Sequence, residues 1–264
     1  MRGAGARLQR ALVALMLARH TTAGYEEIGA LPLLLPAAAL EGTGQLPRFA
    51  DEQYRDADAE RWLSPTAEVQ LTNLHAGEIL AGDALPRRYV AHSVCFRRER
   101  AAGGRDTRGI VRGHQFEKVE LVQLVAPADE DAAFATLLDD ARGVLRALEL
   151  PHRVVALAAD DLGVAAARTH DLEVWAPGLG AWLEVSSVSA CGDFQALRAG
   201  LRYRDAAGAV RPVHTLNGSA LALPRTLIDL LAHHQDAAGC VALPAALRPY
   251  VDGLARLAPT GGAG

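Results

Sequence analysis

Apolar residues recur with helical spacing in four stretches of the chain. The run from Leu8 to Ala18 follows a period of three to four residues, which predicts a first helix over Ala4 to His20. The stretch Asp129 to Leu148 has acids in its first turn and arginines near its end, as the helix dipole favours. Two further helices are expected at Pro65 to Ile79 and at Ser219 to His234.

Strand-like apolar runs fill much of the remaining sequence. A long antiparallel hairpin is expected from Arg88 to Glu99 and His114 to Ala126, joined by the Arg- and Gly-rich loop Arg100 to Arg112, which we expect to be a mobile, positively charged tip. Tyr25 to Leu35 is apolar and extended, is broken by Pro32 and followed by Pro36, and a proline there indicates an edge strand or an interface. Further strands are expected at His152 to Leu157, Thr169 to Trp175, Ala181 to Ser189 and Val213 to Leu216. Helices between and after such strands predict an α+β fold, a mainly antiparallel β-sheet flanked by helices.

The chain shows no internal repeat and no long linker, so we expect one domain over residues 1–258 and a disordered C-terminal tail over 259–264. The apolar run Ala11 to Ala18 is too short to span a membrane. Because Arg19 and His20 follow it in place of a small-residue cleavage site, a buried helix is favoured over a signal peptide. No membrane association is expected.

Charge and cysteine content narrow the function classes. The 264 residues carry 27 basic and 31 acidic side chains, for a net charge of −4, which excludes a protein that binds nucleic acid by bulk charge alone. The three cysteines, Cys95, Cys191 and Cys240, are widely spaced and odd in number. They therefore predict neither a disulfide framework nor a CxxC-type zinc site, and they favour a cytoplasmic protein.

Charged residues in strand-like context are the candidate chemistry. Arg97 and Glu99 lie two residues apart on one predicted strand, Lys118 and Glu120 lie on the next, and Glu184 begins the polar end of another. Taken singly, each is more often a solvent-facing charge on a half-buried sheet. Together with the Arg-rich loop they would make a concave face with both signs of charge, suited to a zwitterion beside a polyphosphate.

A series of short sequence motifs, in the same order along the chain, resembles the catalytic core of bacterial-type seryl-tRNA synthetases, which are class II aminoacyl-tRNA synthetases. The resemblance covers nearly the whole chain, which a lone short motif would not do. The motifs are GAGARL at Gly3, GTGQLPRF at Gly42, TAEV at Thr66, TNLH at Thr72, CFRRE at Cys95, GRDTRG at Gly104, HQFEKVEL at His114, EVSS at Glu184, DFQA at Asp193, HTLNGSALA at His214 and LRPY at Leu247.

The resemblance implies a site for ATP. Arg97 would hold the α-phosphate, Glu99 the adenine amino group and Arg225 the far phosphates, and these arginines with Glu184 are the expected catalytic residues. Guanidinium groups and Mg²⁺ suit this role because attack on phosphorus spreads charge over phosphate oxygens. Glu184 and Ser187 fall on positions that bind a metal, expected to be Mg²⁺. The ATP-binding positions are Arg97, Arg98, Glu99, Glu184, Val185, Ser186, Ser187 and Arg225.

Arg98 is included in that segment, yet strand alternation turns it away from Arg97, and we expect it to be neutral for the chemistry. The resemblance also implies an L-serine site, and the expected serine-binding positions are Thr66, Ala67, Glu68, Glu120 and Ser219. A site that hydrogen-bonds the substrate hydroxyl disfavours alanine, because buried polar atoms are then left unpaired. No zinc is expected, since TAEV and EVSS follow the bacterial pattern.

Further implications of the resemblance concern partners. The first helix and the segment around Pro32 resemble motif 1 of class II synthetases, which implies a homodimer. The hairpin from Arg88 to Ala126 resembles motif 2, and the segment around Arg225 resembles motif 3. The long coiled-coil arm with which the family grips tRNA has no counterpart in this sequence, so tRNA binding is expected to be weak.

Three functions therefore stay open. The first is a serine–tRNA ligase represented by its catalytic core, which activates serine with ATP and transfers it to tRNA(Ser). The second is an armless ligase that passes the activated amino acid to a carrier protein or another acceptor. The third is a non-catalytic paralogue or fragment. The joint presence of six residues weighs against it: Arg97, Glu99, Glu120, Glu184, Ser187 and Arg225.

Overall fold

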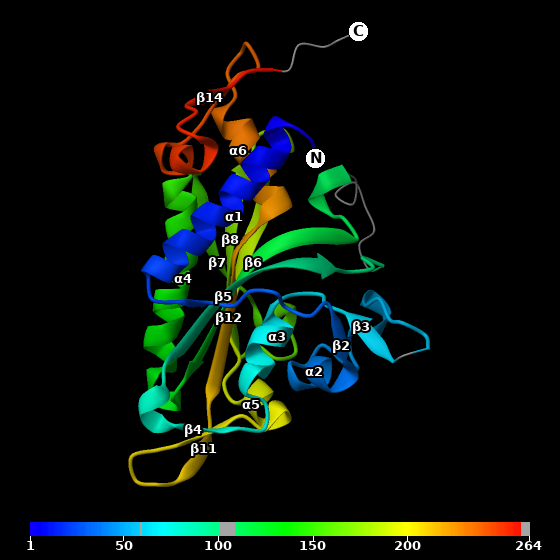
Figure 1. The fold of residues 1–264 in the computed structure, drawn as a ribbon, viewed down its shortest axis with the longest axis vertical. Helices are drawn as coiled ribbons and strands as arrows, with labels where there is room; N and C mark the ends of the chain where they lie inside the picture. Colours follow the sequence, from blue (N-terminus) through cyan, green and yellow to red (C-terminus); the bar gives the residue numbers. More distant parts are fainter. Residues whose placement is uncertain (59, 101–108, 260–264) are drawn as a thin grey trace.

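The computed structural model describes residues 1–58, 60–100 and 109–259, and its centre is a seven-stranded sheet (Figure 1). The strand order is β1-β5-β6-β12-β9-β8-β7. Neighbouring strands are antiparallel except for β1, which pairs in parallel with β5. The predicted mainly antiparallel sheet is confirmed. The strands are β1 Glu26–Glu27, β5 Arg87–Phe96, β6 Gln115–Val125, β7 His152–Ala156, β8 Arg168–Ala176, β9 Ala181–Ala190 and β12 His214–Ala222.

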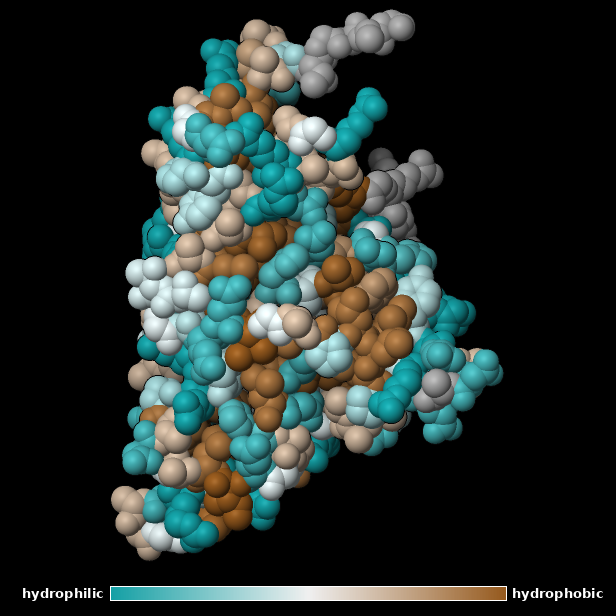
Figure 2. Space-filling view, viewed as in Figure 1, coloured by the Kyte–Doolittle hydropathy of each residue, from teal (hydrophilic) through white to brown (hydrophobic). Residues whose placement is uncertain are grey.

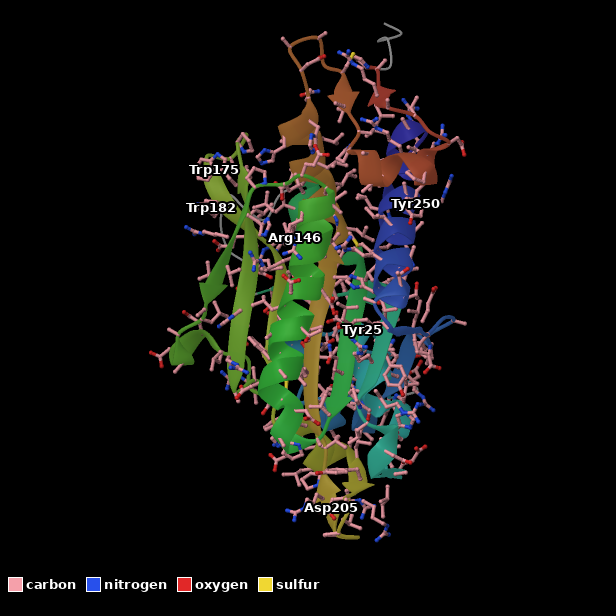
Figure 3. All side chains as sticks on the ribbon, turned by 90° about the vertical axis from the view of Figure 1, so that its left-hand side faces the viewer. Tyr25, Arg146, Trp175, Trp182, Asp205 and Tyr250 are labelled. Carbon is pink, nitrogen blue, oxygen red and sulfur yellow. The ribbon has the colours of Figure 1, made fainter. Side chains whose placement is uncertain are left out.

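Three long helices cover one face of this sheet: α1 Ala4–Thr22, α4 Glu130–Ala147 and α6 Leu223–His234. Figure 3 shows α1 and α4 side by side in front of the strands, with Tyr25 and Arg146 near them. The main core lies between these helices and the sheet, because the apolar stripes of the helices can be buried only there. Fully buried side chains of this core include Leu12, Met16, Leu121, Leu137, Val144, Leu172 and Leu216.

The opposite face of β5 and β6 is covered by shorter elements, and a second core cluster packs there. The helices of this layer are α2 Ala37–Gly42, α3 Glu68–Thr72 and α5 Phe194–Ala199. Small sheets flank them: β2 Leu34–Pro36 with β3 Arg61–Leu63, and β4 Ile79–Ala81 with β10 Arg202–Arg204 and β11 Val210–Pro212. Strands β13 Val241–Ala242 and β14 Arg256–Leu257 form a ribbon near the C-terminus. This layer leaves open the part of the sheet on which the site lies.

Two predicted helices have different bounds in the structure. The helix expected over Pro65 to Ile79 is α helical only over Glu68–Thr72, because the Asn73 amide donates to the carbonyl oxygens of Val69 and Ala39 and the chain turns away. The helix expected from Ser219 begins at Leu223 instead, and Ser219 lies in β12 opposite Glu120. Proline at position 224 is tolerated in the first turn of a helix, where its missing N–H has no partner to lose.

The extended stretch Tyr25 to Leu35 contributes to two short strands in different sheets: β1 is an edge strand of the seven-stranded sheet, as predicted, and β2 pairs with β3. The strand predicted to run to Glu99 ends at Phe96, and Glu99 has a φ of 49°, which takes the chain out of the extended conformation. Of the expected loop Arg100 to Arg112, residues 101–108 lie outside the described residues, and so do residues 260–264 of the expected tail at 259–264. Within the described part of the chain, no helix has the length and hydropathy needed to cross a bilayer.

Candidate active site

A cavity of about 650 Å³ opens on the sheet face opposite α1 and α4. Its walls come from the segment that follows β5, from β6, β9 and β12, from α3 and from the first turn of α6. Segments more than a hundred residues apart in sequence meet here because the sheet order places β12 between β6 and β9. The cavity brings together most of the residues predicted from sequence: Glu68, Arg97, Glu99, Glu120, Glu184, Val185, Ser187, Ser219 and Arg225.

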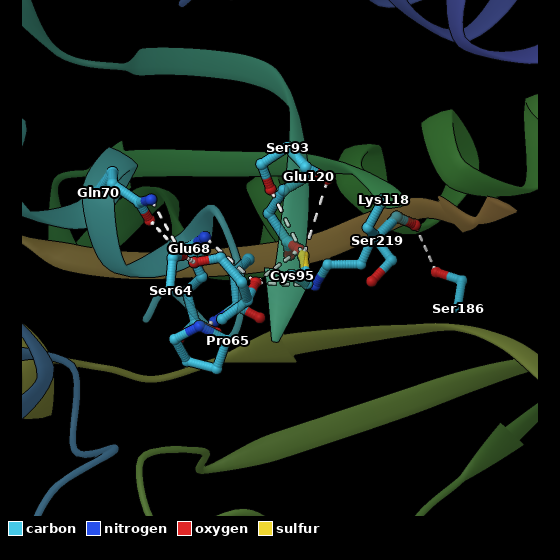
Figure 4. Close-up of polar contacts among 12 residues, drawn as sticks. Ser64, Pro65, Glu68, Gln70, Ser93, Cys95, Lys118, Glu120, Ser186 and Ser219 are labelled. Atoms are coloured by element: carbon cyan, nitrogen blue, oxygen red, sulfur yellow. Dashed lines mark hydrogen bonds and ion pairs between the residues drawn. The ribbon is translucent and has the colours of Figure 1, made fainter. Parts of the chain in front are cut away.

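One end of the cavity is built on a buried ion pair between Lys118 and Glu120, two residues apart on β6 (Figure 4). The Lys118 ammonium also donates to Thr66 Oγ1 at 2.8 Å, and the Thr66 hydroxyl donates to Glu120 Oε2 at 3.0 Å. Lys118 and Glu120 are 7% and 2% exposed, so their charges are compensated by each other and by Thr66, with little help from water. This network fixes the Glu120 carboxylate at the cavity wall.

Glu68, at the start of α3, is the second acid at this end. Its Oε1 accepts hydrogen bonds from Gln195 Nε2 at 2.8 Å and from Asn217 Nδ2 at 3.2 Å. Burial, and then the negative charge of Glu120, raise the pKa of Glu68 to about 6. At neutral pH Glu68 is thus a carboxylate that can accept from a cationic ligand. Ser219, at the β12 bulge, adds a hydroxyl to the same end.

The other end presents arginines. Arg97 follows β5, donates from Nε to the Pro65 carbonyl oxygen at 3.3 Å, and lies with its guanidinium 5.2 Å from the centre of the Phe116 ring. Arg225, in the first turn of α6, donates from Nη1 to the carbonyl oxygen of Glu184 at 2.6 Å and lies 3.5 Å from its carboxylate. These contacts hold two guanidinium groups at the cavity, where they can bind phosphate oxygens.

Glu99 lines the same end of the cavity and accepts a hydrogen bond from Arg112 Nη1 at 2.9 Å. Glu184 and Ser187 lie on β9 and both reach the cavity. Their oxygens are hard donors of the kind that Mg²⁺ prefers. Among the described residues, no cluster of three or more His, Cys, Asp or Glu side chains is arranged to hold a metal ion.

Four predicted residues do not line the cavity. Thr66, Ala67 and Ser186 are buried behind its wall, at 2%, 0% and 1% exposure, and Ser186 donates to the backbone oxygen of Ser219 at 2.5 Å. They can support the wall without facing a ligand. Arg98 turns the other way, and its guanidinium lies 5.9 Å from the ring of Tyr54. Arg98 lies beyond the end of β5 at Phe96, so strand alternation does not explain this placement, and the residue does not line the cavity as its inclusion among the ATP-binding positions implied.

Three residues that build the site, Phe116, Gln195 and Asn217, were given no role from sequence, and Lys118 was named among the charged candidates without a specific role. Phe116 offers an aromatic surface beside Arg97, and Lys118, Gln195 and Asn217 hold the two acids. Each of the four is part of a short motif that resembles the synthetase family, and Lys118 is the one lysine in the sequence. A single polar residue inside an otherwise apolar stretch could have indicated the polar members of this group, because a buried polar side chain needs a hydrogen-bond partner.

Comparison with known proteins agrees with this geometry. The chain is 56% identical over 257 residues to the serine–tRNA ligase of Synechococcus sp. (strain WH7803), which covers 97% of this chain and 60% of that protein. The serine–tRNA ligase of Acidithiobacillus ferrooxidans is 56% identical over 255 residues, with 96% and 60% covered. The chain thus spans about 60% of the length of the curated relatives it matches.

Solved structures give the same result for the fold. The crystal structure of seryl-tRNA synthetase from Pyrococcus horikoshii complexed with ATP matches with a TM-score of 0.93 at 37% identity, covering 98% of this chain and 58% of that one. A prolyl-tRNA synthetase from Giardia lamblia, 17% identical, shares the fold with a TM-score of 0.81. The family model of the tRNA synthetase class II core domain (G, H, P, S and T) matches residues 49–234, a span that includes both acids and both arginines of the cavity. The chain therefore belongs to the class II aminoacyl-tRNA synthetase core family.

Proposed function

We propose that this chain activates L-serine with ATP to form seryl-adenylate and passes the seryl group to tRNA(Ser). The observation that carries the proposal is the division of one cavity into two ends of opposite chemistry. Glu68, Glu120 and Ser219 line one part of the wall, with Lys118 paired to Glu120, and the guanidinium groups of Arg97 and Arg225 line another part together with Glu99 and Glu184. A small zwitterion beside a triphosphate fits this division of charge. The names of the relatives, all serine–tRNA ligases, agree with it.

The acidic end suits the amino acid. The carboxylates of Glu68 and Glu120 are acceptors for an ammonium group, and the hydroxyl of Ser219 is within the same part of the wall. A substrate hydroxyl would pair with polar atoms that alanine would leave unpaired in a buried site. Discrimination against alanine follows from that penalty. Thr66 would act indirectly, because its hydroxyl already bonds Glu120.

The basic end suits ATP. Arg97 would bind the α-phosphate and Arg225 the far phosphates, while Glu99 would accept from the adenine amino group and Phe116 would stack on the base. The serine carboxylate oxygen then attacks the α-phosphorus in line, a P–O bond forms, and the bond to the leaving pyrophosphate breaks. Arg97 lowers the barrier because its fixed charge faces the oxygens on which negative charge develops.

Mg²⁺ fits Glu184 and Ser187, because both place oxygen atoms at the cavity and Mg²⁺ is held in such sites by one or two carboxylates together with phosphates and water. When bound, the ion would neutralise charge on the ATP phosphates. Glu184 also bonds Arg225 through its backbone, so the cation and this arginine would act on the same group of phosphates.

The apolar segment that leads into β2 supports a homodimer as part of the proposal. Leu33 and Leu34 are 37% and 55% exposed, and Figure 2 shows an apolar area over this segment. Exposed apolar areas of this kind are typical of interfaces. Light scattering of the Leu34→Asp variant should then report a smaller species than the wild type.

The three free cysteines support the expected cytoplasmic location.

The direct test supplies the protein with ATP, Mg²⁺, labelled serine and tRNA(Ser), and follows both seryl-adenylate and acid-precipitable seryl-tRNA. Both products are expected, and both should require serine rather than alanine. Adenylate that forms without transfer to tRNA would leave activation in place and point to a carrier protein or another acceptor. The absence of adenylate from the folded protein would refute the proposal.

A further inference from the structure

Gln195 is a fully buried residue of α5 that lies behind the cavity and does not line it. Its amide nitrogen donates to Glu68 Oε1 at 2.8 Å and to the backbone oxygen of Thr43 at 3.3 Å. Its amide oxygen accepts from the Thr215 hydroxyl at 2.7 Å. Three of the four hydrogen bonds that one amide can make are thus directed at groups from three distant segments.

These partners determine which way the amide points. Glu68 Oε1 and the Thr43 carbonyl are acceptors, so both need the amide nitrogen, whereas the Thr215 hydroxyl fills the amide oxygen. A flipped amide would place its oxygen against two acceptors, which is costly at a site with no access to water. Gln195 is therefore a fixed donor to Glu68.

We propose that Gln195 is a positioning residue for the amino acid substrate: it orients the Glu68 carboxylate toward the cavity and so sets the affinity for the substrate ammonium without touching it. The inference rests on the proposed activation of serine. It adds a residue to that site that faces away from the ligand. Asn217, which lines the cavity, also helps to orient Glu68, since its amide donates to the same Glu68 oxygen at 3.2 Å.

The charges that face Glu68 determine how its ionisation would respond. Glu120 of β6 disfavours the carboxylate, Lys118 and Arg97 favour it, and the buried Cys191 thiol is a further titratable neighbour. Burial is the largest influence and raises the pKa, whereas the hydrogen bond from Gln195 lowers it. Loss of that bond should therefore raise the pKa of Glu68 above about 6 and carry its protonation toward neutral pH.

The test uses Gln195→Met, which keeps the length of the side chain and removes both polar atoms. Serine-dependent exchange of pyrophosphate into ATP would be measured from pH 5.5 to 8.5 to obtain KM for serine, KM for ATP and kcat. The KM for serine should rise about tenfold, as expected for a lost hydrogen bond to a charged group. The KM for ATP should change by no more than about twofold. The pH at which serine affinity is half lost should move upward.

Two more variants separate positioning from a general loss of structure. Thr215→Val removes the hydrogen-bond donor to the Gln195 amide oxygen and so holds the amide less firmly, and its KM for serine and its pH midpoint should move in the same direction by a smaller amount. Gln123→Met is the matched control, since Gln123 is also buried at 2% exposure but donates to Tyr25 near α1. It should lower the melting temperature and leave both KM values and the pH midpoint unchanged.

The outcomes distinguish this inference from the function on which it rests. A wild-type protein without serine-dependent exchange overturns the proposed function and the inference with it. An active wild type whose Gln195→Met and Thr215→Val variants keep the wild-type KM and pH midpoint overturns the inference alone. If Gln195→Met does not fold, the Thr215→Val result decides. Equal rises in the KM for serine and the KM for ATP would also contradict it, because a positioning role acts on one substrate.

Discussion

Replacement of Lys118 by methionine would leave the Glu120 carboxylate buried without its cation. The two side chains form an ion pair at 7% and 2% exposure, and Lys118 also donates to Thr66. Methionine keeps most of the volume of the lysine stem, so the loss is electrostatic rather than a cavity. Breaking a buried pair by removing one partner costs about 3–5 kcal/mol. Because the pair borders a solvent-accessible cavity, we expect about 3 kcal/mol.

The assay is urea unfolding followed by circular dichroism at pH 7, with Lys118→Met, Glu120→Gln and the double variant in one cycle. The double variant should recover most of the loss, since no uncompensated charge is then buried. The matched control is Arg146→Met, which removes the cation of an exposed pair with Asp139 at 2.9 Å and should cost less than about 1 kcal/mol. A Lys118→Met cost as small as that of the control would refute the reasoning.

Three further changes have expected outcomes. Arg97→Ala should reduce serine-dependent pyrophosphate exchange at least about a hundredfold, and a reduction within about threefold would remove Arg97 from the chemistry. Burial raises the pKa of Asp229, whose oxygens have no partner among the described residues, from 3.8 to about 7, so its contribution to stability is lost as pH rises from 4 to 7. Measured at several pH values between 4 and 7, the free energy of unfolding of Asp229→Asn should increase relative to that of the wild type as the pH rises. Parallel plots of this free energy against pH would contradict the expectation. Burial lowers the pKa of His20 from 6.5 to about 4, so acid weakens the wild type over that range, and His20→Leu should unfold with less dependence on pH between 6.5 and 4.

The strong periodic segments were predictable from sequence. The hairpin of β5 and β6 and the helix α4 lie within a few residues of their expected bounds, because a regular apolar pattern and helix-end charges agree there. Helix boundaries next to proline were less predictable. Ser219 was expected in a helix, but pairing with β6 keeps the chain extended until Ala222.

Some residues of the candidate site could likewise be predicted from sequence, and others could not. Arg97, Glu99 and Glu184 were found because they belong to short motifs of local sequence. The support behind Glu68 was not predictable, since Thr43, Gln195 and Thr215 come from three segments joined only by tertiary packing. The turn at Glu99 also depends on a φ of 49°, which strand alternation does not anticipate.

The central claim is that the acidic end of the cavity binds serine while the arginine end binds ATP. The most direct measurement is exchange of labelled pyrophosphate into ATP, run without tRNA on the purified chain with serine, threonine, alanine or glycine. We expect exchange that depends on serine, with alanine and glycine near background. A folded protein that shows no exchange with any of the four, or that exchanges equally with alanine and serine, would contradict it.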